Sequence, residues 1–188
     1  MPEDAAPEEL SEEVIYDGRI VHLKRVELRL KDGAVVKREV VVHNGSVGIL
    51  PITASGDFIF VRQFRLPAGR ALLELPAGTL EQGENPTECA QRELAEEIGQ
   101  HAGTMRRMAG FYLAPGWATE FMHAFIAEEL SPRFAKADDD EDIELVTLTL
   151  EQAVEAIRNG EIVDCKSVAL IGLYLMERLT TSQQDAGG

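Results

Sequence analysis

The segment from Leu75 to Gln100 carries more carboxylates than an ordinary helix accommodates. It reads LPAGTLEQGENPTECAQRELAEEIGQ, and its helical part surrounds the single Arg92 with glutamates at positions 88, 93, 96 and 97. A solvated helix usually interleaves glutamate with lysine and gains from opposite charges spaced four residues apart. The excess of negative charge therefore predicts that something in addition to Arg92 neutralises these side chains.

Capping signals mark the two ends of the helix. Asn85 suits the N-cap, Pro86 suits the first helical position, and Glu88 stands three residues after the cap, as in a capping box. Gly99 is placed to end the helix. Apolar residues recurring every four positions predict the face that packs on the core: Ala90, Leu94 and Ile98.

Three glutamates on the opposite face of this helix converge on one patch. Glu93 and Glu97 lie one turn apart, and Glu96 follows Glu93 by three residues. Hard divalent cations such as magnesium bind a few carboxylates, keep several waters and leave positions for substrate phosphates. The pattern therefore indicates a cation site, because a bound cation would relieve the repulsion among the carboxylates.

The loop before the helix supports the same interpretation. Gly78 and Gly83 are expected to take positive φ values, which would fold the backbone back and aim the carbonyl of Ala77 at the patch. Taken alone, however, an E-x-x-E-E pattern is more typical of a surface helix with an excess of glutamate. The choice between these two interpretations depends on the wider spacing.

The wider spacing resembles the Nudix box, the signature of the Nudix hydrolases. Eight of its nine defined positions match, and the departure is Gln100, where the family has an aliphatic residue that packs the turn after the helix. The match consists of Gly78, five residues, Glu84, seven residues, Arg92-Glu93-Leu94, one residue, Glu96-Glu97, one residue and Gly99.

The resemblance implies a Nudix fold, which is a mixed β-sheet between helices and belongs to the α/β (α+β) class. It also implies hydrolysis of a nucleoside diphosphate linked to another moiety, with Mg²⁺ or Mn²⁺ held by the box. Arg92 and Glu84 match the ion pair that orients the helix, and Arg92 and Glu96 match residues that serve catalysis. The metal ligands that the resemblance implies are Glu93, Glu97, Glu96 and the backbone carbonyl of Ala77.

Further matches resemble the ADP-ribose pyrophosphatase branch of the family over residues 14–179. They are RQFR before LLELPAG, and APGWATE, in which Pro115 stands sixteen residues after Gly99. This branch cleaves ADP-ribose to AMP and ribose 5-phosphate, often as a homodimer. An aromatic residue near Tyr16 could add a stacking face. The substrate-binding residues that the resemblance implies are Arg38, Arg65, Glu74, Pro115 and Glu120.

Two other functions remain open from the sequence. The enzyme could hydrolyse another nucleoside diphosphate sugar, such as GDP-mannose or ADP-glucose, because the box reads only the metal and the diphosphate. A Nudix-like module could also sense ADP-ribose without turnover and regulate a partner. The complete set of box carboxylates argues against a sensor.

The acidic run DDDEDIEL at residues 138–145 has two interpretations. A charge run alone is typical of a solvated loop. In the branch that the sequence resembles, the general base lies in this loop, and Glu141 matches its position. A carboxylate there could take a proton from an attacking water. Asp139 is the alternative base, and Glu141 is preferred.

Composition limits the location and the partners of the chain. The net charge of −15 is concentrated in residues 1–13 and 138–144, each with six acids and no base. The remainder is nearly neutral, which argues against a nucleic-acid interface. Cys89 and Cys165 lack zinc or disulfide spacing, and no apolar run is long enough for a membrane span. We therefore expect a soluble cytoplasmic protein without nucleic-acid or membrane partners.

The order of the segments predicts one main domain with an N-terminal extension. Residues 1–13 are expected to form a disordered acidic tail. Residues 14–46 are expected to form an antiparallel strand extension that mediates dimerisation and completes the substrate site. Residues 47–180 form the Nudix domain, and residues 181–188 a flexible C-terminus. Helices are expected over 85–99, 151–160 and 167–179, with strands over 20–30, 34–45, 46–52, 57–64, 110–115, 121–129 and 143–150.

A few other residues are possible site candidates. Cys89 is one turn before Glu93, but a soft thiolate suits magnesium poorly, so a packing role is favoured. Trp117 could line the substrate pocket or simply pack in the core. The four histidines lack ligand spacing. Lys166 precedes the last predicted helix, and the sequence assigns it no function.

Overall fold

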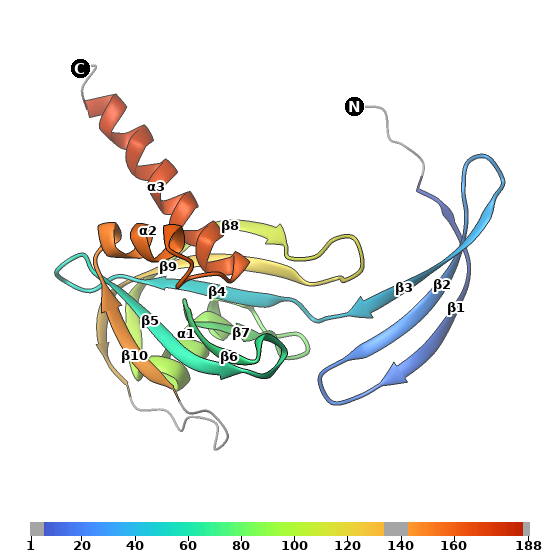
Figure 1. The fold of residues 1–188 in the computed structure, drawn as a ribbon, viewed down its shortest axis with the longest axis horizontal. Coiled ribbons are helices and arrows are strands. Elements are labelled where there is room, and N and C mark those ends of the chain that lie inside the picture. Colours follow the sequence, from blue (N-terminus) through green and yellow to red (C-terminus); the bar gives the residue numbers. More distant parts are fainter. Residues whose placement is uncertain (1–5, 134–142, 186–188) are drawn as a thin grey trace. The chain divides into compact units, whose positions relative to one another are not determined.

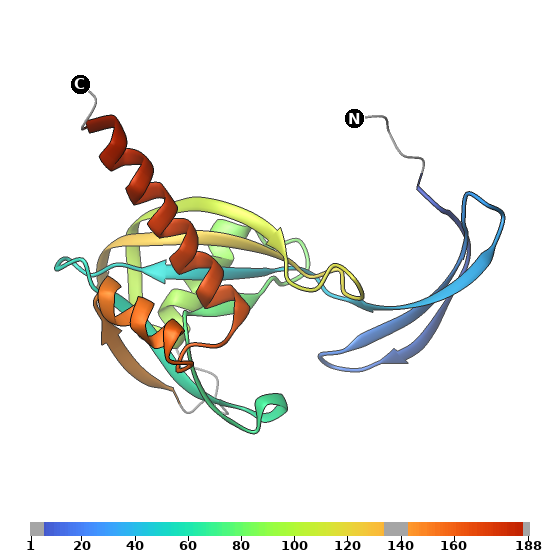
Figure 2. The same cartoon turned by 45° about the horizontal axis from the view of Figure 1, so that its top comes forward.

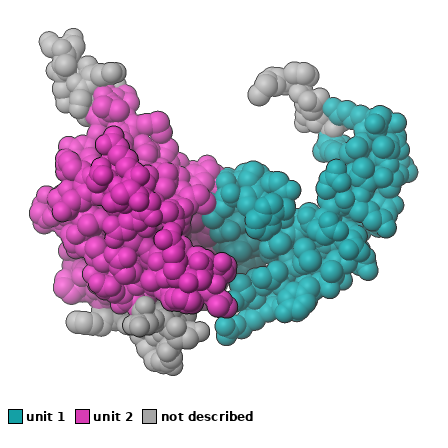
Figure 3. Space-filling view, viewed as in Figure 1, with its two compact units in different colours: residues 1–45, 112–121 teal, residues 46–111, 122–188 magenta. Residues whose placement is uncertain are grey.

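The computed structural model describes residues 6–133 and 143–185, and the chain divides into two compact units (Figure 3). Unit 1 contains the residues up to 45 together with 112–121, and unit 2 contains 46–111 and the residues from 122 onward. The sequence assigned 112–121 to the later domain. The segment joins unit 1 because its backbone bonds to Val41: Val41 N donates to Trp117 O, and Thr119 N donates to Val41 O.

Unit 1 is built on a three-stranded antiparallel sheet with the order β1-β2-β3. The prediction of a disordered tail over 1–13 is wrong for residues 8–13, which form the first part of β1. Acidic side chains of β1 face basic side chains of β2, so the negative charge that argued for disorder is neutralised across the sheet. The strands are β1 (Glu8–Asp17), β2 (His22–Arg29) and β3 (Val35–Val42).

Two further sheets form the body of unit 2 (Figure 1). One has the order β10-β5-β6, and the other has the order β7-β4-β9-β8. β4 runs parallel to β9, whereas its pairing with β7 is antiparallel, so the mixed sheet predicted from the sequence is confirmed. The strands are β4 (Ser46–Pro51), β5 (Phe58–Arg65), β6 (Arg70–Glu74), β7 (Ala77–Thr79), β8 (Gln100–Tyr112), β9 (Phe121–Pro132) and β10 (Glu144–Leu148), and the short 3₁₀ helix η1 is Leu66–Ala68.

Helices cover both sides of these sheets, as the α+β class predicts. α1 (Pro86–Ile98) packs on a buried cluster that includes Val47 and Val61. α2 (Leu150–Arg158) and α3 (Cys165–Asp185) pack on a second cluster, where the rings of Phe58 and Tyr174 meet edge to face at 5.2 Å. The strands of unit 2 therefore lie between α1 and the pair α2 and α3.

Two segments differ from the predicted boundaries. β8 begins directly after α1, ten residues before the predicted strand 110–115, because pairing within the sheet decides its length and its sequence lacks a clear alternation. The flexible C-terminus predicted for 181–188 is wrong for 181–185, which continue α3. No glycine or proline interrupts residues 173–185, so nothing in the sequence stops the helix.

The last turns of α3 project beyond the strands of unit 2 (Figure 2). Its length invites comparison with a membrane span. Among the described residues, however, no helix combines the length and the apolar character that crossing a membrane requires.

Candidate active site

Helix α1 presents the glutamates of the motif because both of its ends are fixed. Asn85 accepts a hydrogen bond from the backbone N–H of Thr87 at 2.8 Å, and Gly99 ends the helix with φ 66°. The predicted core face is buried, with Leu94 fully inaccessible to solvent. Asn85 caps through Thr87 and not through Glu88, so the predicted capping box is replaced by a single cap.

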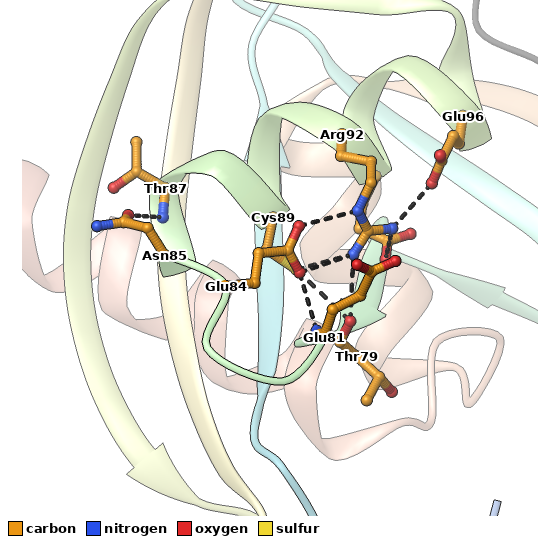
Figure 4. Close-up of polar contacts among 9 residues, drawn as sticks. Thr79, Glu81, Glu84, Asn85, Thr87, Cys89, Arg92 and Glu96 are labelled. Carbon is orange, nitrogen blue, oxygen red and sulfur yellow. Dashed lines mark hydrogen bonds and ion pairs between the residues drawn. The ribbon is translucent and has the colours of Figure 1, made fainter. Parts of the chain in front are cut away.

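Arg92 is the centre of the site (Figure 4). Its Nε and Nη2 donate to the two carboxylate oxygens of Glu84 at 2.9 and 3.0 Å. Its Nη1 donates to Glu93 at 2.7 Å and to Glu96 at 2.9 Å, and Nη2 also reaches the carbonyl of Thr79 at 3.2 Å. The predicted ion pair with Glu84 is therefore present, and two further carboxylates share the same guanidinium.

These contacts shift the protonation equilibria of the site. The hydrogen bonds from Arg92 lower the pKa of Glu84 from 4.5 to about 2, and the same bonds raise the pKa of Arg92. Burial raises the pKa of Cys89 to about 12, so the thiol stays protonated at neutral pH. Cys89 is fully buried, which agrees with the packing role favoured by the sequence.

Gly78 and Gly83 serve the loop in different ways. Gly83 has φ 79°, as predicted, but the positive φ predicted for Gly78 is wrong. A Cβ atom at Gly78 would lie 1.8 Å from Cδ of Glu93 and 1.9 Å from its Oε1. Gly78 is therefore required because the carboxylate of Glu93 occupies the space of a side chain.

Glu97, in the last turn of α1, contacts the backbone of β7. It is only 8% exposed, and its Oε2 accepts a hydrogen bond from the backbone N–H of Ala77 at 3.1 Å. Ala77 begins β7 and pairs with Gly48 of β4. A strand of the sheet thus fixes the position of Ala77 relative to the helix.

The donor atoms of this site fit a hard divalent cation. Within residues 6–133 and 143–185, no three His, Cys, Asp or Glu side chains are already arranged as a metal site. Glu93 and Glu96 nevertheless direct their carboxylates at one cationic nitrogen of Arg92, and Gly78 leaves the space that Glu93 occupies. Clustered carboxylate oxygens suit Mg²⁺ or Mn²⁺. The ligand roles of Ala77, Glu93, Glu96 and Glu97 remain predictions.

A second charged network lies between β5, β6 and the start of α3. Nε and Nη2 of Arg65 donate to Oε2 of Glu74 at 2.9 and 2.7 Å, and Glu74 is 3% exposed. Nζ of Lys166 lies 3.3 Å from the same oxygen and 2.9 Å from Asp164. Ser167 extends the network by accepting the backbone N–H of Leu75 at 2.7 Å.

Lys166 is a residue that sequence reasoning missed. It follows Glu74 by 92 positions, so no local spacing connects the two residues. The sequence feature that could have pointed to Lys166 is the D-x-K-S pattern at the start of the last helix. There Asp164 accepts hydrogen bonds from the backbone N–H and the hydroxyl group of Ser167. Such a capping aspartate was a reason to expect a fixed polar cluster at this point.

The other predicted substrate residues belong to unit 1. Arg38 is exposed on β3 and donates to the carbonyl of Lys37 at 2.9 Å. Glu120 bonds through its backbone carbonyl to Leu113 N at 3.2 Å. Pro115 lines a pocket of about 480 Å³ whose other lining residues are Val40, Tyr112, Gly116, Trp117, Ala118 and Thr119.

Trp117 and Tyr16 are both exposed aromatic residues of unit 1. Each is 59% exposed, so Trp117 is not a core residue. Trp117 lines the pocket beside Pro115, and its role in binding substrate remains a prediction. The two candidates for the general base, Glu141 and Asp139, lie outside the described residues.

Comparison with known proteins assigns these features to a family. The model described as NUDIX domain matches residues 42–166. The chain is 40% identical to "ADP-ribose pyrophosphatase" of Bacillus subtilis (strain 168), over 90% of this chain and 94% of the relative. It is 38% identical to "Methanol dehydrogenase activator" of Bacillus methanolicus (89% and 92%) and 36% identical to "GDP-mannose pyrophosphatase" of Escherichia coli O1:K1 / APEC (85% and 89%).

A solved structure has the same fold. It is described as "Crystal structure of ADP compounds hydrolase" and superposes with a TM-score of 0.85, covering 95% of this chain and 96% of its own. The sequence identity is 23%, so this likeness concerns the fold alone.

We expect Gly78→Ala to weaken divalent cation binding, because the new methyl group would displace the carboxylate of Glu93. Titration with Mn²⁺ followed by electron paramagnetic resonance should show an affinity at least about ten-fold lower. Gly83→Ala is the matched control: it strains a positive φ but meets no atom within 4 Å, so it should lower Tm and leave Mn²⁺ affinity unchanged. Equal Mn²⁺ affinity in both variants would contradict the prediction.

We expect the ion pair of Glu84 to stabilise the fold in a pH-dependent manner. The folded-state pKa is depressed, so the contribution is fully present above about pH 4.5 and is lost as the pH falls toward 2. Urea unfolding at pH 7 should show Glu84→Gln less stable by up to about 3 kcal/mol, with a smaller difference at pH 3. Glu81→Gln, at an exposed loop position, is the control. A pH-independent difference would argue against the ion pair.

Proposed function

The chain belongs to the NUDIX family, and on this premise we propose that it is a metal-dependent pyrophosphatase that hydrolyses ADP-ribose to AMP and ribose 5-phosphate. The observation that carries the proposal is the cluster of Glu84, Glu93 and Glu96 around Arg92, with Glu97 beside it on the same helix. The identity of 40% to an ADP-ribose pyrophosphatase supports the choice of substrate.

The residues of α1 and β7 would hold Mg²⁺ or Mn²⁺ next to the diphosphate. Glu93, Glu97 and Glu96 would supply carboxylate oxygens, and Ala77 its backbone carbonyl. Bound there, the cation supplies charge neutralisation for the diphosphate and a lower pKa for an attacking water. Arg92 keeps the carboxylates together on one side of the helix.

The reaction is a displacement at phosphorus by water. The water oxygen attacks one phosphorus, the bond to the bridging oxygen breaks, and the two phosphates leave as AMP and ribose 5-phosphate. We assign the removal of the water proton to Glu141, because its position matches the general base of the family branch. Arg65 is assigned to the diphosphate, since 39% of its side chain is exposed while the buried Glu74 holds its guanidinium in place.

We further propose that unit 1 recognises the adenosine part and mediates a homodimer. Arg38, Pro115 and Glu120 would contact the substrate, and the pocket beside Pro115 carries the exposed ring of Trp117. Unit 1 exposes apolar side chains, with Val14 of β1 at 67% and Ile20 of the turn between β1 and β2 at 72%, as a surface for a second copy would. A cytoplasmic location is proposed because both cysteines are free thiols.

A second candidate substrate is GDP-mannose, which the relative of 36% identity is named for. The metal site and Arg65 would act on any nucleoside diphosphate sugar, so the nucleotide choice would depend on residues of unit 1. The third candidate is a Nudix-like module that senses ADP-ribose without turnover and regulates a partner, and one relative is named "Methanol dehydrogenase activator". The complete set of box carboxylates favours turnover.

We expect purified protein with Mg²⁺ to convert ADP-ribose to AMP and ribose 5-phosphate faster than it converts ADP-glucose, GDP-mannose, NADH or diadenosine polyphosphate. Chromatography of the products gives the comparison. Glu97→Gln should lower kcat at least about a hundred-fold, because a ligand carboxylate is lost. Glu151→Gln, at an exposed position of α2, is the control. Turnover of GDP-mannose alone would favour the second candidate, and tight binding without any product would favour the sensor.

We expect Glu141→Gln to lower kcat by about a hundred-fold to ten-thousand-fold, the usual contribution of a general base. The variant should keep its KM within a few-fold, because the carboxylate acts on water. Asp139→Asn should have a much smaller effect on kcat. A reversed order of the two effects would assign the base to Asp139.

A further inference from the structure

Gln63 on β5 is a buried polar residue whose amide nitrogen has no partner in the described chain. The residue is 7% exposed, and its Nε2 is inaccessible to solvent and makes no hydrogen bond within residues 6–133 and 143–185. Native proteins pair most of their buried polar atoms, because a buried donor loses its water without compensation. An exception of this kind calls for an acceptor that comes from outside the described chain.

The register of β5 tells which side of the sheet this amide occupies. Side chains alternate along a strand, so Gln63 shares its side with Val61 and Arg65. Val61 belongs to the buried cluster in which α1 packs with Leu94. The pairing of β5 with β6 is regular from Val61 to Arg65, with no bulge to reverse the alternation. Gln63 therefore lies on the side of the sheet that α1 covers.

Arg65 is the next side chain along this side of the strand. It contacts Glu74 through Nε and Nη2, and Glu74 is held in turn by Lys166. The guanidinium is fixed in this way, yet 39% of the side chain stays exposed. An immobilised cation and an unsatisfied N–H donor thus lie two residues apart on one side of β5. Two adjacent donors suit an anionic acceptor with several oxygens.

We propose that Gln63 is a substrate-binding residue: because its Nε2 is covered in the ligand-free chain, substrate binding moves the covering side chains aside, and the amide N–H then donates to an oxygen of the substrate diphosphate beside Arg65. This inference rests on the proposed function and names a further residue of the same site. A neutral amide suits this position because it adds a directed donor without adding charge to the cluster of Arg65, Glu74 and Lys166. The unpaired amide destabilises the ligand-free protein, and the substrate satisfies it on binding.

The test replaces the amide with an apolar group of similar size. Gln63→Met should raise Tm of the ligand-free protein by about 2 to 4 °C, since a buried unsatisfied donor is removed. The same change should weaken ADP-ribose binding by about ten-fold to a hundred-fold, measured by calorimetry in EDTA, where no turnover occurs. These opposite effects on stability and affinity distinguish a substrate contact from a structural role.

Gln91 provides the matched control. Its amide nitrogen donates to the carbonyl of Ala102 at 2.8 Å, and its amide oxygen accepts the N–H of Ala102 at 3.2 Å. Gln91→Met should therefore lower Tm, in contrast to Gln63→Met, and the folded variant should bind ADP-ribose as tightly as the wild type.

The choice of ligands locates the contact on the substrate. Gln63→Met should weaken ADP and ADP-ribose alike and leave adenosine unaffected. The inference is overturned by ADP-ribose affinity within two-fold of the wild type, by loss confined to ADP-ribose, which would assign the contact to the second ribose, or by a lower Tm, which would show a partner inside the protein. If wild-type protein with Mg²⁺ hydrolyses no substrate, the proposed function fails, and the binding experiment still decides on Gln63.

Discussion

The site depends on one guanidinium that holds three carboxylates. Without Arg92, the charges of Glu84, Glu93 and Glu96 would repel one another along a single helix and the loop before it. Because the donors of arginine form a rigid planar fork, each edge engages a different acceptor: Nε and Nη2 hold Glu84, and Nη1 holds the two glutamates of the helix. A lysine offers a point charge without this division.

This constraint also explains the form of the loop. Arg92 reaches the carbonyl of Thr79, Glu97 accepts the N–H of Ala77, and Glu93 occupies the space beside Gly78. The short strand β7 is thus bonded to the helix on one side and to β4 on the other. Carboxylates that would repel one another on an isolated helix are thus held in fixed positions. A metal site requires its ligand oxygens to be fixed in this way before the metal binds.

The sequence predicts those parts of the structure whose physical causes are local. Asn85, Gly99 and the buried Leu94 follow from capping and helical period, and the pair of Arg92 with Glu84 follows from a motif with fixed spacing. The strand over 8–13 was missed because its charges are neutralised by β2, and Lys166 was missed because its partner Glu74 is 92 positions away. For Gly78 the sequence predicts a positive φ, but the structure needs glycine there because the carboxylate of Glu93 fills the space of a side chain. The sequence does not show which residue fills that space.

The two networks of unit 2 differ in how their charge is balanced. Around Arg92, three carboxylates share one arginine, so the cluster as it stands is negative and has capacity for a cation. Around Glu74, the cations of Arg65 and Lys166 face the carboxylates of Glu74 and Asp164, so the charges cancel and Arg65 keeps donors for an anion. A magnesium diphosphate needs both kinds of surface, one for the metal and one for the phosphate oxygens. Under the proposed function neither surface would contact the base, which agrees with relatives that are named for different nucleotide sugars.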